Sequence, residues 1–98
     1  AWMILGGVVT GSEAAAHLRR VLQDSDAIPP AGPYLWHHVI HAAFLVGEDV
    51  LGFRLIENYW GAMLAKGADT FWEVFDPADD FSSPYENVRL NSYCHAWS

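Results

Sequence analysis

A single glutamate, Glu73, lies among aromatic residues in the segment G-A-D-T-F-W-E-V-F-D-P, which covers residues 67–77. Phe71 and Trp72 precede it, and Phe75 follows it. A carboxylate held against apolar rings loses solvation, so we expect its pKa to be raised toward neutrality. Such a pKa suits general acid or base catalysis. The alternative is a surface glutamate in a loop whose aromatic rings turn inward.

Three histidines, His37, His38 and His41, form a second group that could do chemistry. His37 and His41 are four positions apart, so they share one face of a helix. The zinc ligands of a metallopeptidase helix have the same spacing. Position 38, however, holds histidine where zinc peptidases carry glutamate, and the sequence indicates no third ligand. The favoured interpretation is that these histidines lie in the core or at its rim and hydrogen-bond to the backbone or to water. We therefore predict no metal site and no cofactor.

His95 is the third candidate, in the segment N-S-Y-C-H-A-W of residues 91–97. We predict that Asn91 or Ser92 caps a helix there, with His95 in its first turn. The positive end of the helix dipole favours a neutral imidazole, which can hydrogen-bond a sugar hydroxyl. The alternative is a structural histidine that closes the preceding loop. A Cys94–His95 nucleophile pair is disfavoured, because adjacent helical residues point about 100° apart.

Helical spacing predicts the elements that must position these residues. We expect the end of a helix at residues 2–9, helices at residues 12–23, 33–46 and 49–66, a mostly irregular segment at residues 67–90 and a last helix entered at Tyr93. Ser12 is the expected cap of the second helix, and Gly67 the expected end of the fourth. In that fourth helix one apolar stripe is expected to face a core: Phe53, Ile56, Trp60, Met63 and Leu64. No alternating pattern indicates a strand, so the fold class is all-α, built from antiparallel helical hairpins.

Composition narrows the classes of function. The chain has 98 residues, enough for one small domain, and its net charge of −7 argues against nucleic acid and anionic membrane surfaces as partners. Its one cysteine excludes an internal disulfide framework and leaves the compartment open. No apolar run approaches the roughly 20 residues of a membrane span, and no signal peptide is visible, so the localisation is unknown.

The segments G-A-D-T-F-W-E-V-F-D-P and N-S-Y-C-H-A-W-S, joined by a loop with S-P-Y, resemble the α-L-rhamnosidases of glycoside hydrolase family 78. They correspond to the C-terminal part of that family's catalytic domain. The family usually reads G-A-T-T-x-W-E in the first segment, and Asp69 here replaces the first threonine. The stretches P-Y-L-W-H-H-V-I-H-A-A-F-L-V-G and I-E-N-Y-W-G-A-M-L also resemble the family's penultimate hairpin. The resemblance covers essentially the whole chain.

The resemblance implies a six-hairpin glycosidase, an (α/α)₆ barrel or toroid, of which residues 1–98 are a C-terminal fragment of a single catalytic domain. It implies inverting hydrolysis of terminal α-L-rhamnosyl residues. Glu73 matches the general base and His95 a histidine that hydrogen-bonds the sugar, while Trp72 is expected to shape the pocket wall. The general acid of the family lies upstream, and no acid of this chain matches it.

The expected partners are rhamnosides and the rest of the barrel, without which the fragment is expected to be inactive and to self-associate. Three alternatives stay open. One is another six-hairpin glycosidase, related to trehalases or glycogen-debranching enzymes. Another is a non-catalytic helical module that binds a partner through aromatic faces, and the last is a zinc protein.

Overall fold

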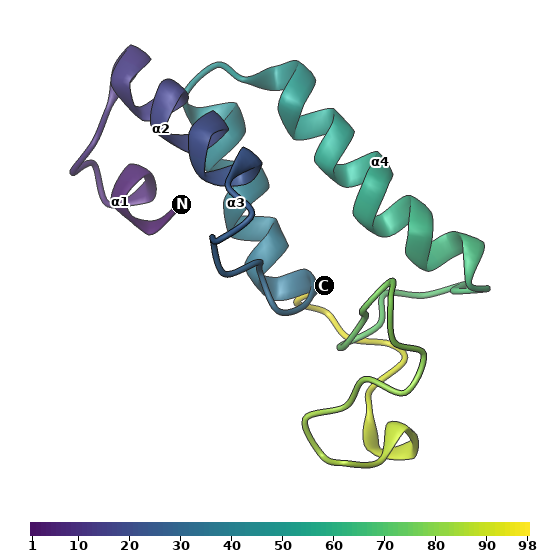
Figure 1. Cartoon of the computed structure of the whole chain (residues 1–98). Helices are drawn as coiled ribbons and strands as arrows, with labels where there is room; N and C mark the ends of the chain where they lie inside the picture. The colour runs from purple at the N-terminus through teal and green to yellow at the C-terminus, as the bar shows by residue number, and fades with distance from the viewer.

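Four α-helices precede a long irregular segment in this chain, whose computed structural model describes all 98 residues (Figure 1). The elements are α1 (Trp2–Leu5), α2 (Gly11–Gln23), α3 (Pro33–Leu45), α4 (Asp49–Ala65) and the short 3₁₀ helix η1 (Val88–Leu90). The one β-type pairing is an isolated bridge between Asp76 and Asp79. The predicted all-α fold class is confirmed.

Helix α2 begins where the backbone changes from an extended to a helical conformation at Thr10, which is its N-cap. Ser12 therefore lies inside the first turn, and the prediction that Ser12 caps the helix is wrong. Glu13 in the first turn and Arg20 in the last turn suit the helix dipole. The helix buries one side of its surface, at Ala14, Ala15 and Leu18.

Helices α3 and α4 form a hairpin that opens away from its turn, and the candidate site segment lies at the open end (Figure 1). Pro33 opens α3, where its missing N–H costs no helical hydrogen bond. Gly47 has a φ of 77° in the turn between the helices, a conformation that favours glycine. Helix α3 also packs against α1. The first core cluster fills the joints among the first three helices, with Ile4, Ala14, Leu18, Ala42 and Ala43.

A second core cluster joins the end of α4 to the irregular segment. Its buried members are Tyr59, Met63, Ala68 and Phe75. The hydroxyl of Tyr59 donates a hydrogen bond to the backbone carbonyl of Phe75 at 2.5 Å. This contact fixes the chain shortly after Glu73 to the last turns of α4, so the helix end positions the candidate site.

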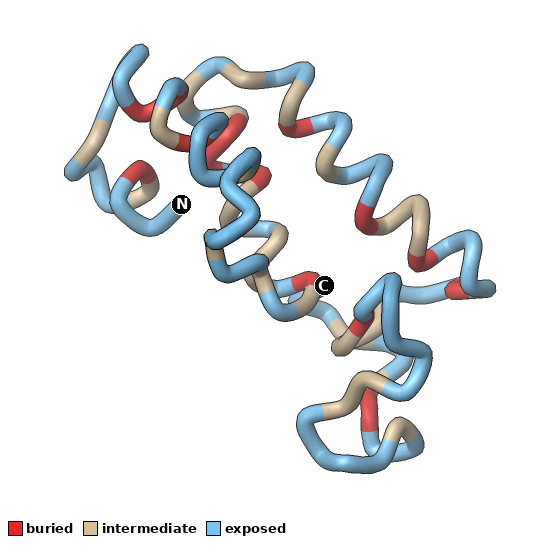
Figure 2. Tube along the Cα trace, viewed as in Figure 1, coloured by how far each residue is buried: buried red, intermediate tan, exposed pale blue.

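The apolar stripe predicted for α4 is only partly buried. Met63 is buried and Trp60 is partly buried on the side that faces α3, whereas Phe53 is 60 % exposed and Leu64 is 65 % exposed. The buried positions of α4 are Gly52, Tyr59 and Met63, and Figure 2 shows them as isolated points along a mostly exposed helix. Within this chain the predicted stripe faces a core only in part, because α3 covers only one side of α4. No helix combines the length and apolar character needed to cross a membrane.

The helix predicted to begin at Tyr93 is absent, and this prediction is wrong. The only helical turn in this region is η1, which ends at Leu90, and the chain from Asn91 onward is irregular. The backbone N–H of His95 donates to the carbonyl of Phe71 at 2.7 Å instead of to a carbonyl of its own segment. Pairing with a distant segment has replaced the helical hydrogen bonds.

Candidate active site

Two segments far apart in the sequence lie side by side at the open end of the hairpin. Besides the bond from His95 to Phe71, the N–H of Glu73 donates to the carbonyl of Ser92 at 2.8 Å. The Ser98 hydroxyl donates to the carbonyl of Trp72 at 2.5 Å. The Thr70 hydroxyl likewise donates to the carbonyl of Tyr93. These bonds bring Glu73 and His95, the two residues predicted to act together, onto neighbouring stretches of backbone.

The Glu73 carboxylate accepts one hydrogen bond on each oxygen. The Tyr85 hydroxyl donates to Oε1 at 2.7 Å, and the backbone N–H of Ser92 donates to Oε2 at 2.8 Å. The residue is partly buried. The carboxylate is therefore held from two sides, by a loop side chain and by the terminal segment.

The pKa of Glu73 lies below its usual value, which corrects the expectation of a raised pKa. The hydrogen bond from Tyr85 lowers it most, the amide of Ser92 lowers it further, and the charge of His95 acts in the same direction. Partial desolvation raises the pKa but is outweighed. The sequence argument failed because hydrogen bonds to the ionised form exceed the effect of the aromatic neighbours.

Two of those aromatic neighbours pack into the second core cluster, and the third is largely exposed. Phe75 is buried in the second core cluster, and Trp72 is packed against that cluster. Phe71 is 58 % exposed. The rings next to Glu73 in sequence therefore leave the carboxylate accessible to hydrogen-bond donors from elsewhere.

The imidazole of His95 is partly buried and begins a row of aromatic rings. Its centroid lies 5.7 Å from that of Trp97, in an edge-to-face arrangement. Trp97 lies 5.8 Å from Tyr34 of α3, centroid to centroid. The ring of His95 is therefore placed beside the start of α3.

Trp72 lines a hollow that is separate from the Glu73 carboxylate. This cavity, about 250 Å³ in volume, is also bordered by Lys66, Asp76 and Tyr93. The indole packs edge-to-face on Tyr93, with ring centroids 5.5 Å apart. The role of Trp72 as part of a sugar-pocket wall stays a prediction.

The three histidines of α3 form no hydrogen bond with Glu73 or His95, although His37 borders a hollow that is also lined by Phe71 and Ser98. The ring of His38 packs between Trp2 and Tyr34, at centroid distances of 4.4 Å and 4.8 Å, and its buried Nε2 has no hydrogen-bond partner. Desolvation lowers the pKa of His38, and the charges of His37 and His41 lower it further. The chain gathers no group of three or more side chains that could hold a metal ion.

Tyr85 is a hydrogen-bond partner of Glu73 that the sequence did not predict. It follows Glu73 by twelve positions across an irregular loop, so no periodic pattern connects the two. The S-P-Y triplet of the family resemblance contains Tyr85, and it is the only feature of the sequence that could have pointed to this residue.

Comparison with known proteins shows the family to which the chain belongs. No protein-family model matches the chain, and no curated protein matches it. Among solved structures, a rhamnosidase from Klebsiella oxytoca with rhamnose bound matches 98 % of this chain at 43 % identity, with a TM-score of 0.90. The chain spans 19 % of the length of that structure. The chain is therefore a homologue of part of a rhamnosidase, which confirms the family resemblance predicted from its W-E and C-H-A-W motifs.

Proposed function

We propose that this chain is the C-terminal part of the catalytic domain of an inverting α-L-rhamnosidase, with Glu73 as general base. The observation that supports this proposal is the backbone pairing that brings Glu73 and His95 together. Both residues belong to motifs by which the chain resembles the family. The enzyme hydrolyses terminal α-L-rhamnosyl residues, and rhamnosides are its substrates.

In this mechanism the Glu73 carboxylate takes a proton from a water molecule. The water oxygen forms a bond to the anomeric carbon while the bond from that carbon to the leaving oxygen breaks. The leaving oxygen receives a proton from a general acid that lies outside this chain. Inversion requires the two carboxyl groups to be about 6.5–9.5 Å apart, so that water and sugar fit between them.

His95 would hold the sugar and Glu73 would stay ionised. The imidazole can donate or accept a hydrogen bond with a sugar hydroxyl. Because the pKa of Glu73 is lowered, the carboxylate remains a proton acceptor across the neutral and mildly acidic range. The base is thus available in the neutral range, where turnover also requires the general acid to carry its proton.

The rest of an (α/α)₆ barrel is the partner that fits the uncovered side of α4. Val50, Phe53 and Leu64 expose most of their surface there. Packing against further helices would bury these side chains, which is the usual way in which helix stripes are covered. The 98-residue chain alone, without the general acid, is expected to be inactive.

Glu73→Gln in the complete enzyme that contains this chain tests the proposal. We expect kcat on nitrophenyl α-L-rhamnoside to fall by about 10²–10⁴-fold, because the amide cannot accept the water proton. Inhibition by rhamnose should change little. The first product formed by the unmodified enzyme should be the β-anomer, as seen by NMR.

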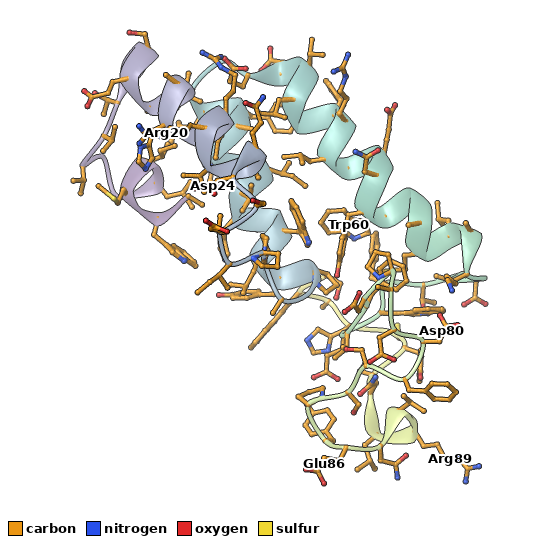
Figure 3. All side chains as sticks on the ribbon, in the orientation of Figure 1. Arg20, Asp24, Trp60, Asp80, Glu86 and Arg89 are labelled. Carbon is orange, nitrogen blue, oxygen red and sulfur yellow. The ribbon has the colours of Figure 1, made fainter.

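Glu86→Gln is the matched control, because Glu86 is exposed at the far tip of the irregular segment (Figure 3). It should retain full activity. A Glu73→Gln enzyme with near-normal turnover would remove Glu73 from the mechanism. Faster hydrolysis of nitrophenyl α-glucoside than of the rhamnoside would favour a related six-hairpin glycosidase instead.

A further inference from the structure

We propose that Tyr85 is a positioning residue, whose hydroxyl holds the Glu73 carboxylate in the orientation needed to accept a proton from water. This inference rests on the proposed function of Glu73 as a general base. Tyr85 lies in the loop that follows Glu73. The inference depends on the hydrogen bond between the Tyr85 hydroxyl and the Glu73 carboxylate.

The two donors to Glu73 act as a clamp on the carboxylate. Tyr85 approaches Oε1 at 2.7 Å and the amide of Ser92 approaches Oε2 at 2.8 Å. A carboxylate has about four acceptor positions, two on each oxygen. One position on each oxygen is therefore filled, and one on each remains for water. Rotation of the carboxylate about its last torsion would break both bonds, so the free positions keep a fixed direction.

The backbone of Tyr85 is itself anchored to a buried residue. Its N–H donates to Ser83 Oγ at 3.2 Å, and that hydroxyl donates to Asn91 Oδ1 at 2.8 Å. Asn91 is buried, and its Nδ2 donates to the carbonyl of Ser82 at 3.0 Å. The turn that carries Tyr85 is thus fixed independently of the phenol ring. Removing only the hydroxyl should leave the turn in place.

The pKa shifts of Tyr85 and Glu73 suit a hydrogen bond in which the phenol donates and the ionised carboxylate accepts. The titratable groups that act on Glu73 are Tyr85 and His95, and both stabilise the ionised carboxylate. The same hydrogen bond raises the pKa of Tyr85, with a further contribution from the charge of Glu73. The phenol therefore keeps its proton throughout the neutral range, where the carboxylate is ionised.

Tyr85→Phe in the complete enzyme tests the proposal through the pH profile of kcat/KM. The acid limb of this profile reports the pKa of the base in the free enzyme. Loss of the hydroxyl should move the acid limb to higher pH and lower kcat by about tenfold, as expected for a lost hydrogen bond to a charged group. Inhibition by rhamnose should be unchanged, which shows that the site is folded.

Tyr93→Phe is the matched control, because it removes an exposed hydroxyl that donates to the carbonyl of Val88 at 2.9 Å. The acid limb of its pH profile should stay in place, because this hydroxyl makes no hydrogen bond to Glu73. An acid limb that stays in place in Tyr85→Phe overturns the proposal, whatever happens to kcat. Loss of rhamnose inhibition in this variant also overturns it, since the hydroxyl would then be needed to build the site.

The proposed function can fail separately from this inference. If Glu73→Gln retains turnover, the general base has been assigned to the wrong residue. If Glu73→Gln is inactive while Tyr85→Phe keeps the acid limb in place, only the role of Tyr85 is refuted.

Discussion

Glu73 and Ser92 exchange two hydrogen bonds. The N–H of Glu73 donates to the carbonyl of Ser92 at 2.8 Å, and the N–H of Ser92 donates to the carboxylate of Glu73, also at 2.8 Å. The two residues are 19 positions apart in the sequence. The exchange ties the carboxylate to the stretch of backbone that bears His95, so the relative position of the two side chains depends on this pairing.

The direction of the Glu73 pKa shift predicts a pH profile. A base whose pKa is depressed is ionised above that pKa and loses function only as the pH falls through it. We therefore expect the acid limb of kcat/KM, measured in the complete enzyme, to have its midpoint below 4.5, the ordinary value for glutamate. The same shift stabilises the fold above the unfolded-state pKa, and this contribution is lost as the pH falls through the folded-state pKa. A midpoint near neutrality would restore the original expectation of a desolvated carboxylate.

Two glycines of α4 are expected to respond to alanine in opposite directions. A Cβ at Gly52 would lie 2.8 Å from the nearest ring atom of Phe44 on α3. Gly52→Ala should therefore lower the free energy of unfolding by about 1–3 kcal/mol, the usual cost of overpacking. A Cβ at Gly61 meets nothing within 4 Å, so Gly61→Ala should raise the free energy by about 0.5–1 kcal/mol through helix propensity. Urea unfolding of the chain, followed by circular dichroism, measures both; equal effects would mean that the hairpin is not closely packed at Gly52.

The buried hydroxyl of Tyr59 is expected to stabilise the junction between α4 and the site segment. Tyr59→Phe leaves the Phe75 carbonyl without its partner, which should cost about 1–3 kcal/mol in free energy of unfolding. Tyr93→Phe removes an exposed hydroxyl instead and should cost less. The urea midpoints of the two variants provide the comparison. Similar small shifts in both would show that water replaces the Tyr59 bond.

The exposed apolar side of α4 predicts that the isolated chain self-associates. Val50 is 68 % exposed, and Phe53 and Leu64 are exposed to a similar degree. Apolar surface of this kind marks an interaction site or an aggregation risk. Light scattering over a dilution series should give a mass above the 10.9 kDa of the monomer, and Phe53→Glu should lower it. A soluble monomer at every concentration would contradict this prediction and count against the chain's need for further helices.

The three longer helices were predictable because their signals are local. Pro33, Gly47 and Gly67 mark helix ends through their own backbone preferences, and the observed helices end within a residue or two of the expected positions. The last helix was predicted on the same kind of signal, a polar cap before apolar residues, and it does not form. Instead, the backbone groups of Ser92 and His95 form hydrogen bonds with residues 71–73. No local sequence pattern predicts that such long-range bonds will replace the helical ones.

The sequence by itself determined the all-α class, the approximate helix positions and, through its motifs, the relationship to rhamnosidases. It also predicted Glu73 and His95 as site residues. Only the tertiary structure decided that Tyr85 and Ser92 donate to Glu73 and that the pKa of this carboxylate is lowered. The reason is physical. Helix propensity and capping act over a few neighbouring residues, whereas the charge state of Glu73 depends on donors 12 and 19 positions away, brought to it by loops without periodicity.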